Sequence, residues 1–167
     1  TLRDAAETAT WLERLGGMSL MPGHVRLPRG EAVDGLPGYA EGAWWVQDIA
    51  ASLPARALGA GEAKDGTKLT VLDLCAAPGG KATFIAQCME NQGRVVAYDN
   101  NRERLALIRE NCSRLGASCV QVHSHEPAGI AFDKILVDAP CSNTGVLRRR
   151  IESRWRRAKS CTRSRAK

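Results

Sequence analysis

The stretch "LTVLDLCAAPGGKATFIAQCME", residues 69–90, decides the fold. It opens on a short apolar run, "LTVLDL", which is typical of a buried strand. It closes on "KATFIAQCME", where apolar residues recur at helical spacing and are expected to face inward: Phe84, Ile85, Cys88 and Met89. Between the two lies a turn of small residues with Gly79 and Gly80 side by side. The sequence therefore predicts a strand that turns sharply into a helix.

The same alternation continues toward the C-terminus. "RVVAYD" at 94–99, "SCVQV" at 118–122 and "KILVD" at 134–138 read as further strands. The segment 101–116 reads as a helix that stops at Gly116, with an inward face of Leu105, Ile108, Cys112 and Leu115. Strands that alternate with helices predict an α/β domain with a parallel sheet and right-handed crossovers.

The residues before this pattern are less regular. Residues 1–15 predict a helix whose apolar face is Ala5, Ala9, Leu12 and Leu15, and residues 16–42 are rich in Gly and Pro, which favours short strands and turns. Residues 43–58 predict a helix with Val46, Ile49, Ala50 and Leu53 on its apolar face. We expect an N-terminal element with its linker at 1–40, the main domain at 41–155, and a disordered basic tail at 156–167.

Charge is unevenly distributed along the 167 residues. The net charge is +6, and residues 148–167 hold ten Lys or Arg and one Glu, or +9, so residues 1–147 sum to 6 − 9 = −3. A basic segment attracts nucleic-acid phosphates, although a solvated chain end explains it equally well. No apolar run approaches the roughly 20 residues that span a bilayer, and no signal peptide is visible. We therefore expect a cytoplasmic protein without a membrane partner.

The six cysteines do not predict a metal site. None forms a Cys-x-x-Cys pair, and no His lies at a metal-ligand spacing from one of them. Cys88 and Cys112 fall on apolar helical faces, where free thiols act as small buried hydrophobes. We expect reduced thiols and no bound metal.

Polar residues follow each predicted strand: Asp73, Asp99, a site near Glu126, and Asp138. Ligands of open parallel sheets bind at the carboxyl ends of the strands. Asp99 lies twenty residues beyond Gly79 in the sequence, at the end of the second predicted strand. A carboxylate at this spacing from a glycine-rich turn can accept hydrogen bonds from both hydroxyls of a ribose. A nucleoside cofactor site is one interpretation, and an ordinary tight turn is the other. The loop matches neither the dinucleotide fingerprint nor the P-loop spacing.

Two motifs carry a family resemblance. "DLCAAPGGKAT" at 73–83 followed by "VDAPCSNTGVLRR" at 137–149 resembles the RNA cytosine-C5 methyltransferases, the family of bacterial ribosomal-RNA and Nop2/Sun-type enzymes. The resemblance extends over roughly residues 1–155 and includes "LPGYAEGAWWVQDIAA". It implies a Rossmann-like S-adenosylmethionine-dependent methyltransferase fold, a mostly parallel sheet with helices on both faces, incomplete at the C-terminus, with an RNA-binding type of element at 1–40.

The resemblance also implies the cofactor, S-adenosyl-L-methionine. The residues that it places around this cofactor are Cys75, Ala76, Ala77, Pro78, Gly79, Gly80, Lys81, Asp99, Glu126 and Asp138. The family has an Asp near the adenine at the end of the third strand. Here "VQVHSHEP" offers Glu126 or a histidine instead.

Methylation of cytosine at C5 needs covalent catalysis, because C5 is a poor nucleophile until a thiolate adds to C6. The resemblance assigns Asp138 to contact the base and Cys141 to assist release of the covalent intermediate. It assigns the attacking thiolate to a Thr-Cys motif, which this sequence lacks; Cys161 precedes Thr162 in the reverse order. We therefore interpret the chain as truncated, and expect it to be poorly stable and catalytically impaired. Robust multiple-turnover methylation would contradict that.

The expected function is formation of 5-methylcytosine in RNA, with ribosomal RNA as the expected class and transfer RNA as an alternative that the sequence leaves open. Arg148, Arg149 and Arg150 could meet RNA phosphates, or form a solvated surface run. We expect a monomer. The alternatives are a catalytically inactive chain that binds cofactor or RNA, and a nicotinamide-dependent oxidoreductase on the same fold.

Overall fold

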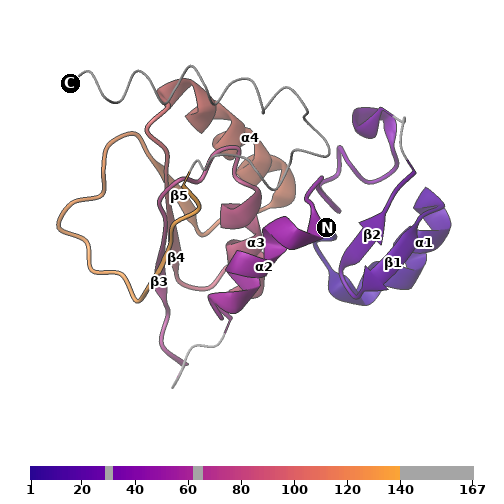
Figure 1. Cartoon of the computed structure of the whole chain (residues 1–167), viewed down its shortest axis with the longest axis horizontal. Helices are drawn as coiled ribbons and strands as arrows, with labels where there is room; N and C mark the ends of the chain where they lie inside the picture. The colour runs from indigo at the N-terminus through magenta and orange to yellow at the C-terminus, as the bar shows by residue number, and fades with distance from the viewer. Residues whose placement is uncertain (29–31, 62–65, 140–167) are drawn as a thin grey trace, which may run out of the picture.

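The structure, a computed structural model, describes residues 1–28, 32–61 and 66–139 (Figure 1). The first part holds the 3-10 helix η1 (Ala5–Glu7), helix α1 (Thr8–Leu15), strands β1 (Met18–Met21) and β2 (His24–Arg26), and the 3-10 helix η2 (Val33–Gly35). The second part runs through α2 (Ile49–Ala57), β3 (Thr70–Asp73), α3 (Gly80–Cys88), β4 (Arg94–Tyr98), η4 (Arg102–Arg104), α4 (Leu105–Leu115), β5 (Val120–His123) and β6 (Lys134–Leu136). None of these described helices is both long and apolar enough to cross a membrane.

The four predicted strands form one parallel sheet in the order β5-β4-β3-β6. The order places β3 in the middle, with Asp73 level with Ala97 of β4 and Leu136 of β6. All four strands therefore end at the same edge, as the alternating pattern predicts. The α/β class and the parallel sheet are confirmed.

One face of this sheet carries the main core. Val71, Val95 and Ala97 point from the strands toward Ile85 of α3 and Ile108 of α4, and all five side chains are fully buried. Figure 1 shows α2, α3 and α4 together on this side of the sheet. The described elements include no helix on the opposite face, so helices on both faces remain a prediction.

The N-terminal helix differs from its prediction. It begins as η1, capped by the Asp4 carboxylate that accepts from Ala6 N, and becomes α-helical only at Thr8. The predicted face is wrong at Ala5 and Ala9, which are exposed, whereas Trp11 is buried. Trp11 packs with Leu2 and Trp44 in a small second core. A large indole removes far more apolar area from water than two methyl groups, so it sets the buried face.

The helix predicted over 43–58 is wrong in its first six residues. α2 begins only at Ile49, where the Asp48 carboxylate caps it by accepting from Ala50 N. Val46 is 67% exposed and Leu53 is exposed too, while the buried residues of α2 are Ser52 and Ala55.

The physical reason lies in the two preceding tryptophans. Trp44 is paired with Leu2 by an isolated antiparallel bridge, and its ring belongs to the N-terminal core. Trp45 belongs to the main core beside Phe84. Successive side chains of an extended backbone point to opposite sides, whereas a helix would put them 100° apart. The extended backbone thus lets one dipeptide bury two indoles in two cores.

Arg114, in the last turn of α4, joins the N-terminal part to the main domain. Its Nη1 donates to the carbonyl oxygens of Tyr39 at 2.7 Å and Trp44 at 3.0 Å, and its guanidinium lies 4.0 Å above the Tyr39 ring. Gly42 lies against the same turn. A Cβ added there would lie 1.7 Å from the carbonyl oxygen of Arg114. Residues 39–45, which we call the linker from here on, therefore touch α4 through bare backbone.

Replacing Gly42 with Ala should strongly destabilise the fold. Gly42 and Gly116 share a left-handed φ of +67°, but a Cβ at Gly116 meets nothing within 4 Å. Gly116→Ala should therefore lose only about 1 kcal/mol of unfolding free energy, from the left-handed backbone. Gly42→Ala adds a backbone clash and should lose about 3 kcal/mol. Equal losses in urea unfolding would contradict the close packing of the linker on α4.

Candidate functional site

The predicted cofactor residues cluster at the carboxyl edge of the sheet, around the segment 74–79, which we call the glycine loop. Two backbone hydrogen bonds tie this loop to the neighbouring strands. Leu74 N donates to Leu136 O of β6 at 3.0 Å, and Ala76 N donates to Tyr98 O of β4 at 2.9 Å. The loop is thus anchored on both sides of β3 before the chain enters α3.

Gly79 ends the loop and precedes the first residue of α3. Its φ of +106° lies in the region that L side chains rarely adopt, and a Cβ there would lie 3.2 Å from Cα of Ile108. The first N–H groups of a helix have no partner within the helix and attract negative charge. Gly79 thus presents the start of α3 to the carboxyl edge of the sheet.

Asp99, directly after β4, faces the glycine loop. Its Oδ2 accepts from Ala77 N at 3.1 Å, and its Oδ1 accepts from Asn101 N at 2.9 Å. The Arg104 guanidinium approaches Oδ2 at 3.9 Å. The side chain is nearly buried, so these contacts hold the carboxylate in one orientation.

Lys81 and Asp138 form an ion pair across this edge. Nζ of Lys81, in the first turn of α3, lies 2.5 Å from Oδ2 of Asp138, two residues after β6. The Asp138 side chain is 50% exposed and the Lys81 side chain 21% exposed, so the pair is open to solvent. An exposed pair contributes little stability, yet it places one cation and one anion where a substrate can reach them.

Asp73, the last residue of β3, has no exposed surface, and neither carboxylate oxygen has a hydrogen-bond partner among the described residues. Burial raises the pKa of Asp73 to about 7; Lys81 opposes this rise, and Asp138 and Asp99 add to it. Asp73 therefore lies close enough to Lys81, Asp138 and Asp99 to feel the charge of all three. Asp73 lies outside the predicted site, although its place at a strand end is visible in the sequence.

The other predicted residues divide into three groups. Cys75 is half-buried, and its thiol pKa is raised by burial and by Asp99 and the other nearby carboxylates, which disfavours the reactive thiolate. Glu126 is exposed and lines a hollow of about 370 Å³ after β5 together with His123 and His125. Cys141, like the arginines 148–150, lies outside the described residues. The roles of all these residues remain predictions.

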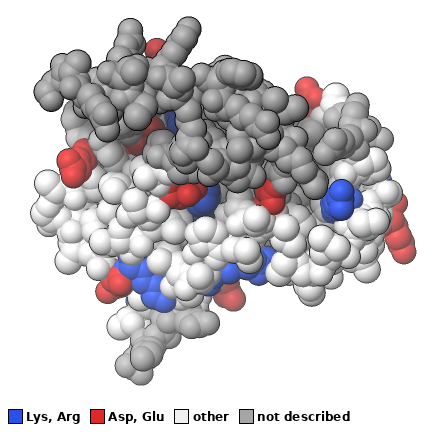
Figure 2. Space-filling model, in the orientation of Figure 1, with Lys and Arg blue, Asp and Glu red and all other residues white. Residues whose placement is uncertain are grey.

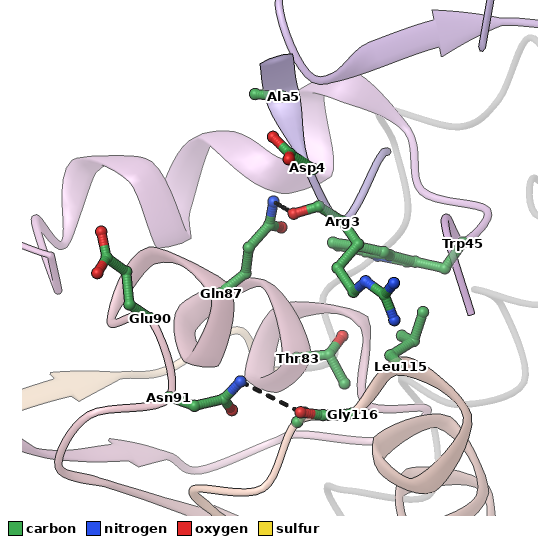
Figure 3. A pocket seen from close by; sticks show the side chains of 11 residues that line it. Arg3, Asp4, Ala5, Trp45, Thr83, Gln87, Glu90, Asn91, Leu115 and Gly116 are labelled. Atoms are coloured by element: carbon green, nitrogen blue, oxygen red, sulfur yellow. Dashed lines mark hydrogen bonds between the residues drawn. The ribbon is translucent and has the colours of Figure 1, made fainter. Parts of the chain in front are cut away.

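A larger hollow of about 500 Å³ lies elsewhere, between the N-terminal segment and the C-terminal ends of α3 and α4 (Figure 3). Arg3, Trp45, Gln87 and Asn91 are among its lining residues. Gln87 donates to the backbone oxygens of Leu2 and Arg3. None of the predicted site residues lines this hollow. No group of three or more His, Cys, Asp or Glu side chains in the described part of the chain could hold a metal ion.

Similarity to known proteins agrees with this geometry. Residues 62–165 match the family described as 16S rRNA methyltransferase RsmB/F. The ribosomal RNA small subunit methyltransferase B of Klebsiella pneumoniae is 42% identical over 142 residues, which cover 81% of this chain and 32% of the relative. The chain spans about a third of the length of the curated relatives that it matches.

Two solved structures from Pyrococcus horikoshii have the same fold. A methyltransferase homologue superimposes with a TM-score of 0.71 at 26% identity, covering 87% of this chain and 51% of that one. NSun6 in complex with SFG, an S-adenosylmethionine analogue, superimposes with a TM-score of 0.59 at 34% identity, covering 73% of this chain and 32% of that one. These likenesses confirm the methyltransferase fold of the described domain.

The buried carboxyl of Asp73 should make stability depend on pH. A carboxyl whose pKa rises on folding, here from 3.8 to about 7, stabilises the folded state at low pH and loses that effect as pH rises. Asp73→Asn removes the titration. Its unfolding free energy, relative to that of the unchanged protein, should increase by about 2 kcal/mol between pH 5.5 and pH 8.5. A difference in urea unfolding that is independent of pH would contradict this.

Proposed function

Because the chain belongs to the 16S rRNA methyltransferase RsmB/F family, we propose that it acts as an S-adenosylmethionine-dependent methyltransferase that forms 5-methylcytosine in ribosomal RNA. The observation that carries the proposal is the Lys81–Asp138 ion pair beside the glycine loop. It joins the two motifs of the resemblance at one edge of the sheet, through two residues that lie 57 positions apart in the sequence. When bound, S-adenosylmethionine supplies a methyl group made electrophilic by its sulfonium.

The residues present fit the nucleoside part of this cofactor. A carboxylate has about four acceptor positions, and the two backbone N–H groups on Asp99 occupy only one on each oxygen. Asp99 can therefore accept ribose hydroxyls without breaking its own contacts. The free N–H groups at the start of α3 and the Lys81 ammonium suit the carboxylate of the methionine part. The hollow beside Glu126 is the proposed place of the adenine.

The ion pair suits the target base. An ionised Asp138 accepts from the exocyclic amino group of cytosine, and Lys81 holds this carboxylate in place as a donor. When a thiolate adds to C6, negative charge develops on the ring toward N3 and O2. A fixed ammonium close to the base stabilises that charge. The base has to leave its stack to reach these residues, because its ring carbons are inaccessible in a helix.

Cys141 follows Asp138 by three residues and, by the resemblance, assists release of the covalent intermediate. RNA is the proposed partner. On the face visible in Figure 2, basic and acidic side chains of the described residues are interspersed rather than gathered by sign. The excess of positive over negative charge instead lies in residues 148–167, which hold ten Lys or Arg and one Glu. A ribosomal RNA substrate supports the cytoplasm as the proposed location, and the monomeric state remains a prediction.

A second candidate function is binding of cofactor or RNA without turnover. The observation that favours it is that the thiol pKa is raised, mainly by burial, at each of the four described cysteines, which disfavours an attacking thiolate. The nicotinamide alternative has no comparable support, because the family match is to methyltransferases.

Two measurements test these functions. Calorimetry with S-adenosylmethionine reports binding, with the reduced nicotinamide dinucleotide as the competing ligand. Incubation with methyl-labelled cofactor and small-subunit ribosomal RNA, followed by nucleoside analysis, reports 5-methylcytosine. Binding with methylation supports the methyltransferase, and binding without methylation supports the second candidate. A chain that binds the nicotinamide nucleotide and not S-adenosylmethionine would refute both.

Asp99→Asn should weaken the binding of S-adenosylmethionine about 10- to 100-fold, because the amide accepts at one atom only and lacks the charge that strengthens hydrogen bonds to hydroxyls. Calorimetry measures the dissociation constant. Glu13→Gln, a change of an exposed carboxylate on α1, is the control and should bind like the unchanged protein. Unaltered binding by Asp99→Asn would remove Asp99 from the cofactor site.

Asp138→Asn should leave cofactor binding within about threefold but lower methyl transfer at least 100-fold, a loss of roughly 2.7 kcal/mol of transition-state stabilisation. The neutral amide holds the Lys81 ammonium less strongly, and it has only one acceptor oxygen to share between this ammonium and the amino group of cytosine. Single-turnover transfer to ribosomal RNA measures the effect. An equal loss in cofactor affinity and rate would instead place Asp138 mainly in the cofactor site.

A further inference from the structure

The glycine loop has a second set of contacts that no motif predicts. They come from one face of α4 and from the residue before it. Arg104, Ile108 and Asn111 are spaced by four and three residues, so they lie on one side of the helix. Together they touch three consecutive loop residues, Ala77, Pro78 and Gly79, though not in the order of the helix.

The middle contact is apolar and close. Gly79 lies on Ile108 with so little space that an added Cβ would lie 3.2 Å from the Ile108 backbone and 3.3 Å from its side chain. This contact fixes the distance between loop and helix. By itself it does not fix how the peptide groups of the loop are turned.

The outer two contacts are polar and hold carbonyl groups. Nη2 of Arg104 donates to Ala77 O at 2.8 Å, and Nδ2 of Asn111 donates to Pro78 O at 2.9 Å. Asp99 takes the N–H of Ala77, so both polar groups of this residue are held. The side chains of α4 and of the residue before it thereby orient two successive carbonyls of the loop.

Asn111 is itself oriented by Arg114, which also contacts the linker. Its Oδ1 accepts from Nη2 of Arg114 at 3.4 Å, while Nη1 of Arg114 donates to the backbone of Tyr39 and Trp44. Because Arg114 can only donate, the Asn111 atom that faces it must be the amide oxygen. The amide nitrogen of Asn111 then faces Pro78 O and donates to it. A continuous polar path thus runs from the linker to the glycine loop.

We propose that Asn111 and Arg104 are positioning residues for the cofactor: they hold the glycine loop in its binding shape, and Arg114 orients Asn111 from the linker. The proposal rests on the proposed function, in which this loop binds S-adenosylmethionine. Neither side chain needs to touch the ligand. A loop whose carbonyls are already oriented loses less conformational freedom on binding, so the affinity is higher.

The test uses S-adenosylmethionine calorimetry and urea unfolding on the full chain. Asn111→Asp keeps the shape but replaces the donor by an acceptor facing Pro78 O, and Arg104→Gln removes the guanidinium. Each should weaken binding about tenfold. Arg109→Ala changes an exposed arginine of the same helix and should leave binding unchanged.

A merely structural role is distinguished by two readouts. Variants that lose unfolding free energy but bind the cofactor as tightly as the unchanged protein would overturn the proposal. Arg114→Met should weaken binding in the unchanged background and have no effect in the Asn111→Ala background, because it acts through Asn111. Additive effects of the two changes would remove Arg114 from the proposal.

Failure of the proposed function has a different result. If the unchanged protein binds no S-adenosylmethionine, both proposals fall together. If it binds but the Asn111 and Arg104 variants bind equally well, only the positioning role falls. If Asn111→Asp does not fold, Arg104→Gln decides by the same comparison.

Discussion

The site depends on how closely the glycine loop approaches α4 at Gly79. A side chain at Gly79 would be tight against Ile108, 3.2 Å from its Cα, and would be strained by the left-handed φ of +106° with which the chain enters α3. This one contact sets where α3 begins. It thereby places Lys81 opposite Asp138 and brings the loop backbone within reach of Asp99.

Electrostatics and burial then divide the acidic residues by role. Asp73 is buried without a partner among the described residues, and its pKa, raised to about 7, makes the neutral form accessible near neutral pH. Asp99 is nearly buried but holds two backbone N–H groups, and Asp138 is exposed and paired with a lysine. Three carboxylates at one edge of a sheet thus differ in their surroundings, because Asp99 and Asp138 have described polar partners and Asp73 has none.

The N-terminal part contributes more than a separate element would. Trp44 and Trp45 anchor its linker in two cores, and Arg114 connects the same linker to the helix that supports the loop. These contacts join the part that the family resemblance associates with RNA to the part that it associates with the cofactor. In this arrangement, a change in the linker would reach the glycine loop through two side chains, Arg114 and Asn111.

The sequence by itself determined the order of strands and helices, the turn at Gly79 and the spacing to Asp99, because these depend on periodicity and on neighbours in the chain. It also indicated the methyltransferase family through two motifs. Only the tertiary structure decided which residues bury in the N-terminal part, since Trp11 and the extended Trp44–Trp45 pair depend on partners far along the chain. The tertiary structure also decided that Asp73 has no described hydrogen-bond partner, that Lys81 pairs with Asp138, and that the glycine loop accepts hydrogen bonds from Arg104 and Asn111. Each of these features depends on segments that are far apart in the sequence and that come together only when α3 and α4 pack on the sheet. A local sequence pattern therefore cannot predict them.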